Sequence, residues 1–126
     1  MKKAEKLTID KILQKKAILE TAETKSYYSK FFDAEIDIED LPLKKISDIV
    51  SKDYGDNPLR ADFELIYASC PILRNKQLKE KYEIEDPIDI VEVVFDHNAG
   101  EIQGLAKAIL RRYGLESDKA DTIKKQ

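Results

Sequence analysis

The chain has 126 residues, a formal net charge of −3, 42% apolar residues and 37% charged residues. This size allows one domain with one modest core, and the acidic balance disfavours general nucleic-acid binding, which requires a basic domain or stripe. No apolar run approaches the ~18 residues of a membrane span, and no apolar signal core follows Met1-Lys2-Lys3. We therefore expect a single cytoplasmic domain over residues 1–115, without membrane or nucleic-acid binding, and a polar flexible tail over residues 116–126.

Charge is unevenly spread along the chain. Residues 1–30 hold eight lysines against four acids, whereas residues 31–66 hold ten acids against four bases. Such asymmetry can mark a partner surface, although a solvated face is the favoured interpretation for any single run. A nucleic-acid role for the lysine-rich first helix is an alternative, which a strong salt dependence of binding would reveal.

The first third of the chain changes its hydrophobic period. Apolar residues at helical spacing predict a helix over residues 6–22, with Ile9, Ile12, Leu13 and Ala17 on its stripe. Residues 25–39 instead contain the alternation of Ile36 and Ile38 with acids, which is typical of a half-buried strand. Four strand-forming aromatic residues precede them, and Asp33-Ala34 predicts a tight turn. Two short strands are expected here.

The remaining sequence predicts helices with readable ends. Pro42 favours a helix start, Gly55 a position just past that helix, and Pro71 the end of the helix after Pro58. A short helix is expected through Leu73, Leu78 and Tyr82. Asp86-Pro87 predicts a capped helix over residues 88–95, although the β-branched residues there leave a strand open. The final helix begins at Glu101 and ends at Gly114.

The predicted fold class is mainly α: a small domain of about five to six short helices with a two-stranded β element near the N-terminus. In a chain this short, the apolar stripes of the helices are expected to pack mostly on one another.

We find no catalytic constellation in the sequence. His97 is the single histidine, and Cys70 lies on a helical apolar stripe, where a free cysteine behaves as a small buried apolar residue. The acids between Asp33 and Asp40 alternate along an expected strand, which indicates a wet face. The four glycines form no phosphate-binding motif. We therefore expect no enzyme activity, no metal and no cofactor.

A binding function is the remaining possibility from the residues alone. Small helical bundles often leave a groove or an apolar patch uncovered, and such a patch can dock a partner helix. The candidate partner-binding residues are the aromatic side chains ahead of the acidic strand: Tyr27, Tyr28, Phe31 and Phe32.

The order of helix starts and stops is itself informative. It runs through Leu41-Pro42-Leu43, Ser69-Cys70-Pro71-Ile72-Leu73, Leu78, Tyr82, Asp86-Pro87-Ile88-Asp89-Ile90-Val91, Gly100-Glu101-Ile102, Ile109-Leu110 and Gly114. In this order and spacing, residues 25–115 resemble the XkdN-like tail assembly chaperones of long-tailed phages and phage-tail-like particles.

The resemblance implies a non-catalytic prophage or phage protein of the bacterial host cytoplasm. Such a chaperone binds the tape measure protein, keeps it soluble and hands it over as the tail tube polymerises. The tail tube protein and further copies of the chain are additional candidate partners. The family has no established catalytic residues to transfer. The alternative is a structural tail connector or completion protein, which would be retained in the particle.

Overall fold

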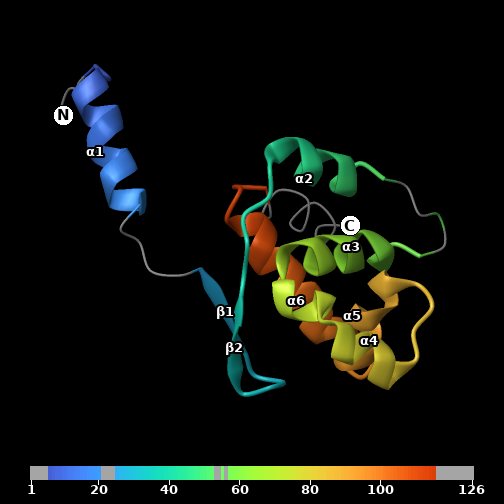
Figure 1. Ribbon diagram of the computed structural model, residues 1–126. Coiled ribbons are helices and arrows are strands. Elements are labelled where there is room, and N and C mark those ends of the chain that lie inside the picture. The colour runs from blue at the N-terminus through green and yellow to red at the C-terminus, as the bar shows by residue number, and fades with distance from the viewer. Residues whose placement is uncertain (1–5, 21–24, 53–54, 56, 116–126) are drawn as a thin grey trace.

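The computed structural model describes residues 6–20, 25–52, 55 and 57–115. This part of the chain is mainly helical, with one two-stranded antiparallel sheet near the N-terminus, which is the predicted fold class (Figure 1). The expected tail over residues 116–126 lies outside the described residues. The elements are α1 (Ile9–Glu20), β1 (Ser26–Ser29), β2 (Ala34–Asp37), α2 (Leu43–Val50), α3 (Leu59–Ser69), the 3-10 helix η1 (Pro71–Arg74), α4 (Lys76–Tyr82), the 3-10 helix η2 (Pro87–Asp89), α5 (Ile90–Val94) and α6 (Ala99–Arg111).

Helix α3 lies at the centre of the helical body. It packs against α6 on one side and contacts α2 and α5, while β1 contacts α6 (Figure 1). These helices bury their apolar stripes against one another, as expected, and each fully buried aliphatic or aromatic side chain contributes about 1.5–3 kcal/mol. The buried apolar residues are Ile38, Ile46, Ile49, Phe63, Leu65, Ile66, Cys70, Leu73, Ile90, Val91, Val94, Phe95, Ile102, Leu105, Ala106 and Ile109.

Helix α1 departs from this arrangement. It forms within the predicted range, and the Thr8 hydroxyl accepts a hydrogen bond from the Lys11 amide at 3.2 Å, as at a helix N-terminus. Figure 1 shows α1 apart from the helical body, and five large apolar residues in or beside this helix are each more than half exposed. The exposed set is Leu7, Ile9, Ile12, Leu13 and Ile18. Helix α1 is therefore the exception to the expectation that the stripes pack mostly on one another, and residues 21 and 22 lie outside the described residues.

The β1–β2 hairpin confirms the predicted alternation. Tyr27 pairs with Ile36 on the half-buried face, and Tyr28 pairs with Glu35 on the exposed face. The predicted turn at Asp33-Ala34 is wrong, because the turn spans residues 30–33 and Ala34 already belongs to β2. The Ser29 hydroxyl accepts the Phe32 amide at 3.3 Å, and Asp33 ends the turn in a left-handed conformation with φ +51°.

The base of the hairpin is tied to the far end of the chain. The Tyr113 hydroxyl accepts the Leu41 amide at 2.8 Å, and the Asp40 carboxylate accepts from Arg112 at 2.7 Å and from Lys25. Partial burial alone would raise the pKa of Asp40, but the hydrogen bonds from Lys25 and Arg112 outweigh it and lower the pKa. These contacts fix the hairpin against the C-terminal end of α6.

The segment after α3 contains two helices where the sequence predicts one. Pro71 ends α3 as expected and opens η1, but Asn75 then breaks the helix. Asn75 has an extended backbone, and its side chain accepts the Gln77 amide at 2.8 Å to start α4. An asparagine side chain competes with the helix for backbone donors in this way, which is why it favours a cap over a helix interior.

The later helix ends follow the sequence closely. The Asp86 side chain accepts the Ile88 amide at 3.2 Å with Pro87 at the first helical position, and residues 88–95 are helical up to Val94 rather than a strand. Helix α6 begins two residues before the expected Glu101, because Asn98 accepts the Glu101 amide at 3.1 Å and caps the helix. Gly114 follows that helix with φ +72°, as expected of a glycine stop.

Helix α4 ends on a residue poorly suited to its conformation. Glu83 is exposed and adopts a left-handed backbone with φ 52° and ψ 49°, where a side chain costs about 1–2 kcal/mol. Glycine relieves this strain, but it also loses more backbone entropy on folding, which offsets part of the gain. Glu83→Gly is therefore expected to raise the free energy of unfolding by about 0.5–1 kcal/mol. Urea denaturation measures the change. Glu83→Ala is the control and should give no gain, because alanine keeps the strained Cβ.

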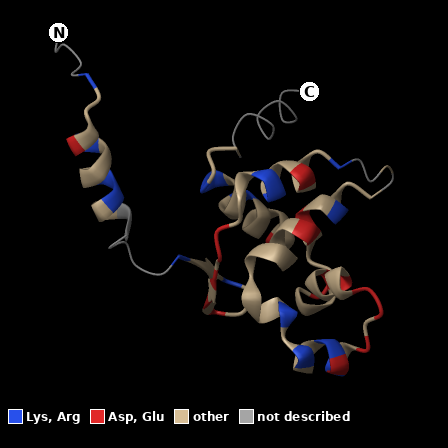
Figure 2. Cartoon of the chain, turned by 45° about the horizontal axis from the view of Figure 1, so that its top comes forward, with Lys and Arg blue, Asp and Glu red and all other residues tan. Residues whose placement is uncertain are grey.

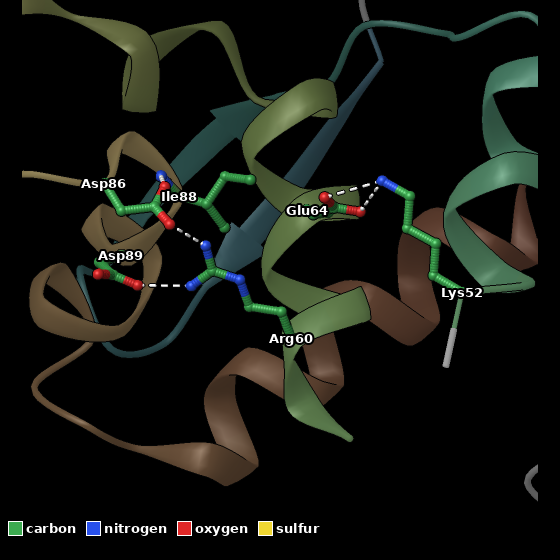
Figure 3. A network of polar contacts seen from close by, with 6 residues as sticks. All are labelled: Lys52, Arg60, Glu64, Asp86, Ile88 and Asp89. Carbon is green, nitrogen blue, oxygen red and sulfur yellow. Dashed lines mark hydrogen bonds and ion pairs between the residues drawn. The ribbon is translucent and has the colours of Figure 1, made fainter. Parts of the chain in front are cut away.

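A polar network joins α3 to the start of η2 (Figure 3). The Arg60 guanidinium donates to Asp89 at 2.6 Å and to Asp86, while Lys52 donates to both oxygens of Glu64 at 3.1 Å. The Arg60 side chain is only 17% exposed, whereas Lys52 is 49% exposed. Burial opposes the charge on Arg60, but its hydrogen bonds to Asp89 and Asp86 outweigh this effect and raise the pKa of the guanidinium. Arg60 thus fixes the segment that leads into α5.

Candidate partner-binding surface

Three exposed aromatic residues gather at the turn of the hairpin, and we call them the aromatic surface: Tyr28, Phe31 and Phe32. These residues are 52%, 41% and 44% exposed, respectively. The rings of Phe31 and Phe32 meet edge to face with centroids 5.0 Å apart, and the Tyr28 hydroxyl donates to the carboxylate of Asp33, the residue after Phe32. The three side chains therefore lie around one short turn.

The aromatic surface has a buried support. Phe95, at the end of α5, is 1% exposed, and its ring centroid lies 5.2 Å from Phe32 and 5.8 Å from Phe31. Aromatic rings at this separation stabilise one another by about 0.5–1.5 kcal/mol per pair beyond the area they bury. The inner edges of the two turn phenylalanines are thus held by the core, while their outer edges remain open to a partner.

The surroundings of the aromatic surface are acidic. On the exposed face of the hairpin, Glu35 lies opposite Tyr28, Asp37 follows two residues later, and Asp33 closes the turn. Figure 2 shows acidic residues along the hairpin and lysines along α1. The hydrogen bond to Asp33 raises the pKa of Tyr28, because the carboxylate holds the phenolic proton. An apolar partner segment with basic residues would match this surface.

The four residues singled out from the sequence do not form one surface. Tyr27 lies on the opposite face of β1 from Tyr28, is half-buried against the core, and places its hydroxyl close to Gly104 of α6. A Cβ added at Gly104 would lie 3.6 Å from that hydroxyl, which is ordinary van der Waals contact. Tyr27 therefore positions the hairpin, and the other three aromatic residues remain accessible.

Sequence reasoning missed Phe95 as part of this region. Its position at the end of a β-branched apolar run signalled burial only, and nothing in that run indicates which distant aromatic residues it contacts. The contact joins positions more than sixty residues apart, so it depends on how α5 and the hairpin pack against α6. A pattern within one element cannot supply that information.

The exposed His97 ring contacts the Glu92 carboxylate, with Nδ1 and Oε2 2.6 Å apart. Among the described residues, no group of three or more His, Cys, Asp or Glu side chains could hold a metal ion.

Cys70 is buried, as its sequence position predicts, and burial raises the pKa of its thiol to about 12, with nearby Arg74 offsetting only part of the effect. The thiolate is the reactive form, so a rise of about three pKa units leaves roughly a thousandfold less of it at pH 8. We expect a disulfide reagent to modify the native chain about a thousandfold more slowly than the urea-unfolded chain. Native and unfolded rates within a factor of about ten would contradict a raised pKa of the native thiol.

Within the described part of the chain, no helix has both the length and the apolar character needed to cross a bilayer. Comparison with known family models, curated proteins and solved structures gave no match to this chain.

Proposed function

We propose that this chain is a non-catalytic tail assembly chaperone of a phage or phage-tail-like particle. It binds helical segments of the tape measure protein through the aromatic surface, keeps them soluble in the bacterial host cytoplasm, and releases them as the tail tube polymerises. The observation that carries the proposal is the set of exposed aromatic side chains, Tyr28, Phe31 and Phe32, standing on the buried ring of Phe95. The resemblance of residues 25–115 to the XkdN-like chaperones supports it.

The small size of the aromatic surface suits a chaperone that must release the tape measure protein. Three half-exposed aromatic side chains offer on the order of 250 Å² of apolar contact, well below a stable interface. Each contact is therefore weak, and a long helix-rich tape measure would need many copies bound along its length. The acids beside the surface favour client segments whose apolar stripe is flanked by lysine or arginine.

The test is co-expression with the tape measure protein encoded next to this chain. The wild-type chain should yield a soluble complex with several copies per tape measure, as measured by size exclusion with light scattering. The double variant Tyr28→Ser/Phe32→Ser should lower the soluble fraction by about tenfold or more, because two apolar contacts are lost. Tyr82→Ser is the matched control, since Tyr82 is 46% exposed on α4, outside the aromatic surface.

The possible outcomes distinguish a wrong placement of the contact from a wrong role for the chain. If the double variant keeps its fold and still solubilises the tape measure, the contact lies elsewhere on the chain. If the wild-type chain leaves the tape measure insoluble and is found in purified particles, it is a structural tail connector or completion protein. A chaperone should be depleted from the finished particle.

A further inference from the structure

Helix α1 and the aromatic surface are complementary in chemistry. Residues 6–20 carry four lysines against two acids, with Ile9, Ile12 and Leu13 exposed on one stripe. The hairpin, residues 26–37, carries three acids against one lysine around the exposed aromatic side chains. Thus an apolar helix with basic neighbours, the kind of segment that the aromatic surface fits, is present within the chain itself.

We infer that α1 of one copy docks on the aromatic surface of a second copy, and that the exchange is reciprocal, giving a two-fold symmetric dimer. The lengths agree: twelve helical residues extend about 18 Å, and a four-residue strand about 13 Å before its turn is added. One such contact is small, but two in a closed dimer reinforce each other. The inference does not rest on the proposed function, because it concerns this chain alone.

A second copy is favoured over the same copy by the direction of the chain. Helix α1 precedes β1, and β1 runs away from α1 toward the turn that holds Phe31 and Phe32 (Figure 1). The aromatic surface of the same copy therefore lies at the end of β1 that is remote from α1. Pairing of α1 with another α1 is disfavoured, since it would bring the lysine-rich helices together.

Docking would also place α1 where a client helix is proposed to bind. Two copies would then cover each other's aromatic and apolar side chains until a client segment displaces α1. Helix α1 and a client helix would compete because both would bind the same aromatic surface. The complex with the client should therefore contain fewer contacts between copies of this chain than the free protein does.

The first test is sedimentation velocity of the full-length chain over a range of micromolar concentrations. A concentration-dependent dimer is expected, and it should weaken as salt is raised, because lysines meet acids across the contact. Leu13→Gln should weaken the dimer by about tenfold or more through loss of a buried leucine contact. Glutamine retains a good helix propensity, so α1 itself should persist.

Ile18→Gln is the matched control. Ile18 is 62% exposed, and it lies nine residues from Ile9, which places it on the opposite side of the helix. This variant should dimerise like the wild type. On the other side of the contact, Phe32→Ser should weaken the dimer, and Glu35→Lys provides a second variant at an exposed position if Phe32→Ser unfolds.

Mixing the two defective variants gives the sharpest result. Leu13→Gln keeps an intact aromatic surface and Phe32→Ser keeps an intact α1, so the mixture retains one good contact of two and should form heterodimers more readily than either variant alone. A wild-type chain that stays monomeric overturns the inference and points to docking within one copy. So does a mixture no more associated than its components, or an Ile18→Gln defect equal to that of Leu13→Gln.

Discussion

Phe95→Ala is expected to lower the free energy of unfolding by about 3–5 kcal/mol, because it empties a fully buried aromatic site in the core. Small domains have about 5–15 kcal/mol of stability in total, so the variant should unfold at a much lower urea concentration. The loss should extend to partner binding, since Phe31 and Phe32 both rest on this ring. Urea denaturation and the co-expression assay measure the two effects.

The variant Phe31→Ala distinguishes the role of Phe95 as a buried support from the role of Phe31 as a contact for the partner. Phe31 is 41% exposed, so its removal should cost about 1 kcal/mol of stability while still weakening partner binding. Phe95→Leu keeps most of the buried volume and should recover more than half of the stability lost in Phe95→Ala. A larger loss of stability in Phe31→Ala than in Phe95→Ala would contradict this division between a buried support and an exposed contact.

Arg60→Met is expected to lower the free energy of unfolding by about 1–2 kcal/mol. The variant keeps the apolar stem but removes the hydrogen bonds to Asp86 and Asp89, and hydrogen bonds to charged groups contribute about 1.5–3 kcal/mol when well shielded. The two aspartates are about half exposed and can be hydrated again, which places the expected loss around the lower end of that range. Thermal or urea denaturation measures the change.

Lys52→Met is the matched control in the same network (Figure 3). The Lys52 side chain is 49% exposed and its partner Glu64 is 16% exposed, and loss of this single ion pair should cost about 1 kcal/mol or less. The difference between the two variants should narrow at high salt, where the Debye length falls to about 3 Å. Equal losses for Lys52→Met and Arg60→Met would mean that the lower exposure of Arg60 and its contacts with two aspartates do not matter for stability.

The helix boundaries were largely predictable because they depend on chemistry within a few residues. Asp86-Pro87, Pro71 and Gly114 act through a side-chain acceptor, a missing amide donor and a left-handed backbone, respectively, and all three mark helix ends in the structure. The alternation around Ile36 and Ile38 was equally local, and it placed the acids on the exposed face of the hairpin. Asn75 was the local signal that reasoning overlooked.

The candidate site was predictable only in part, because it depends on contacts between distant segments. Strand propensity placed Phe31 and Phe32 in a strand, but their rings pack on Phe95 and the Ser29 hydroxyl holds them in a turn. The same local reasoning treated Tyr27 and Tyr28 alike, although their faces differ. The apolar stripe of α1 likewise predicted a helix, but periodicity does not say what the stripe packs against.

The hydrogen bonds of Leu41 and Asp40 at the base of the hairpin also affect the order in which parts of the fold form during translation. Leu41 is synthesised 72 positions before Tyr113, its hydrogen-bond partner, and Asp40 is synthesised 72 positions before Arg112. Phe95 also follows the hairpin in the chain. At about 5–20 residues per second, a ribosome takes roughly 4–14 seconds to add those positions. During that interval the nascent hairpin has its aromatic side chains but not their support. An aromatic surface with all of these supporting contacts therefore forms only after synthesis has passed the end of α6.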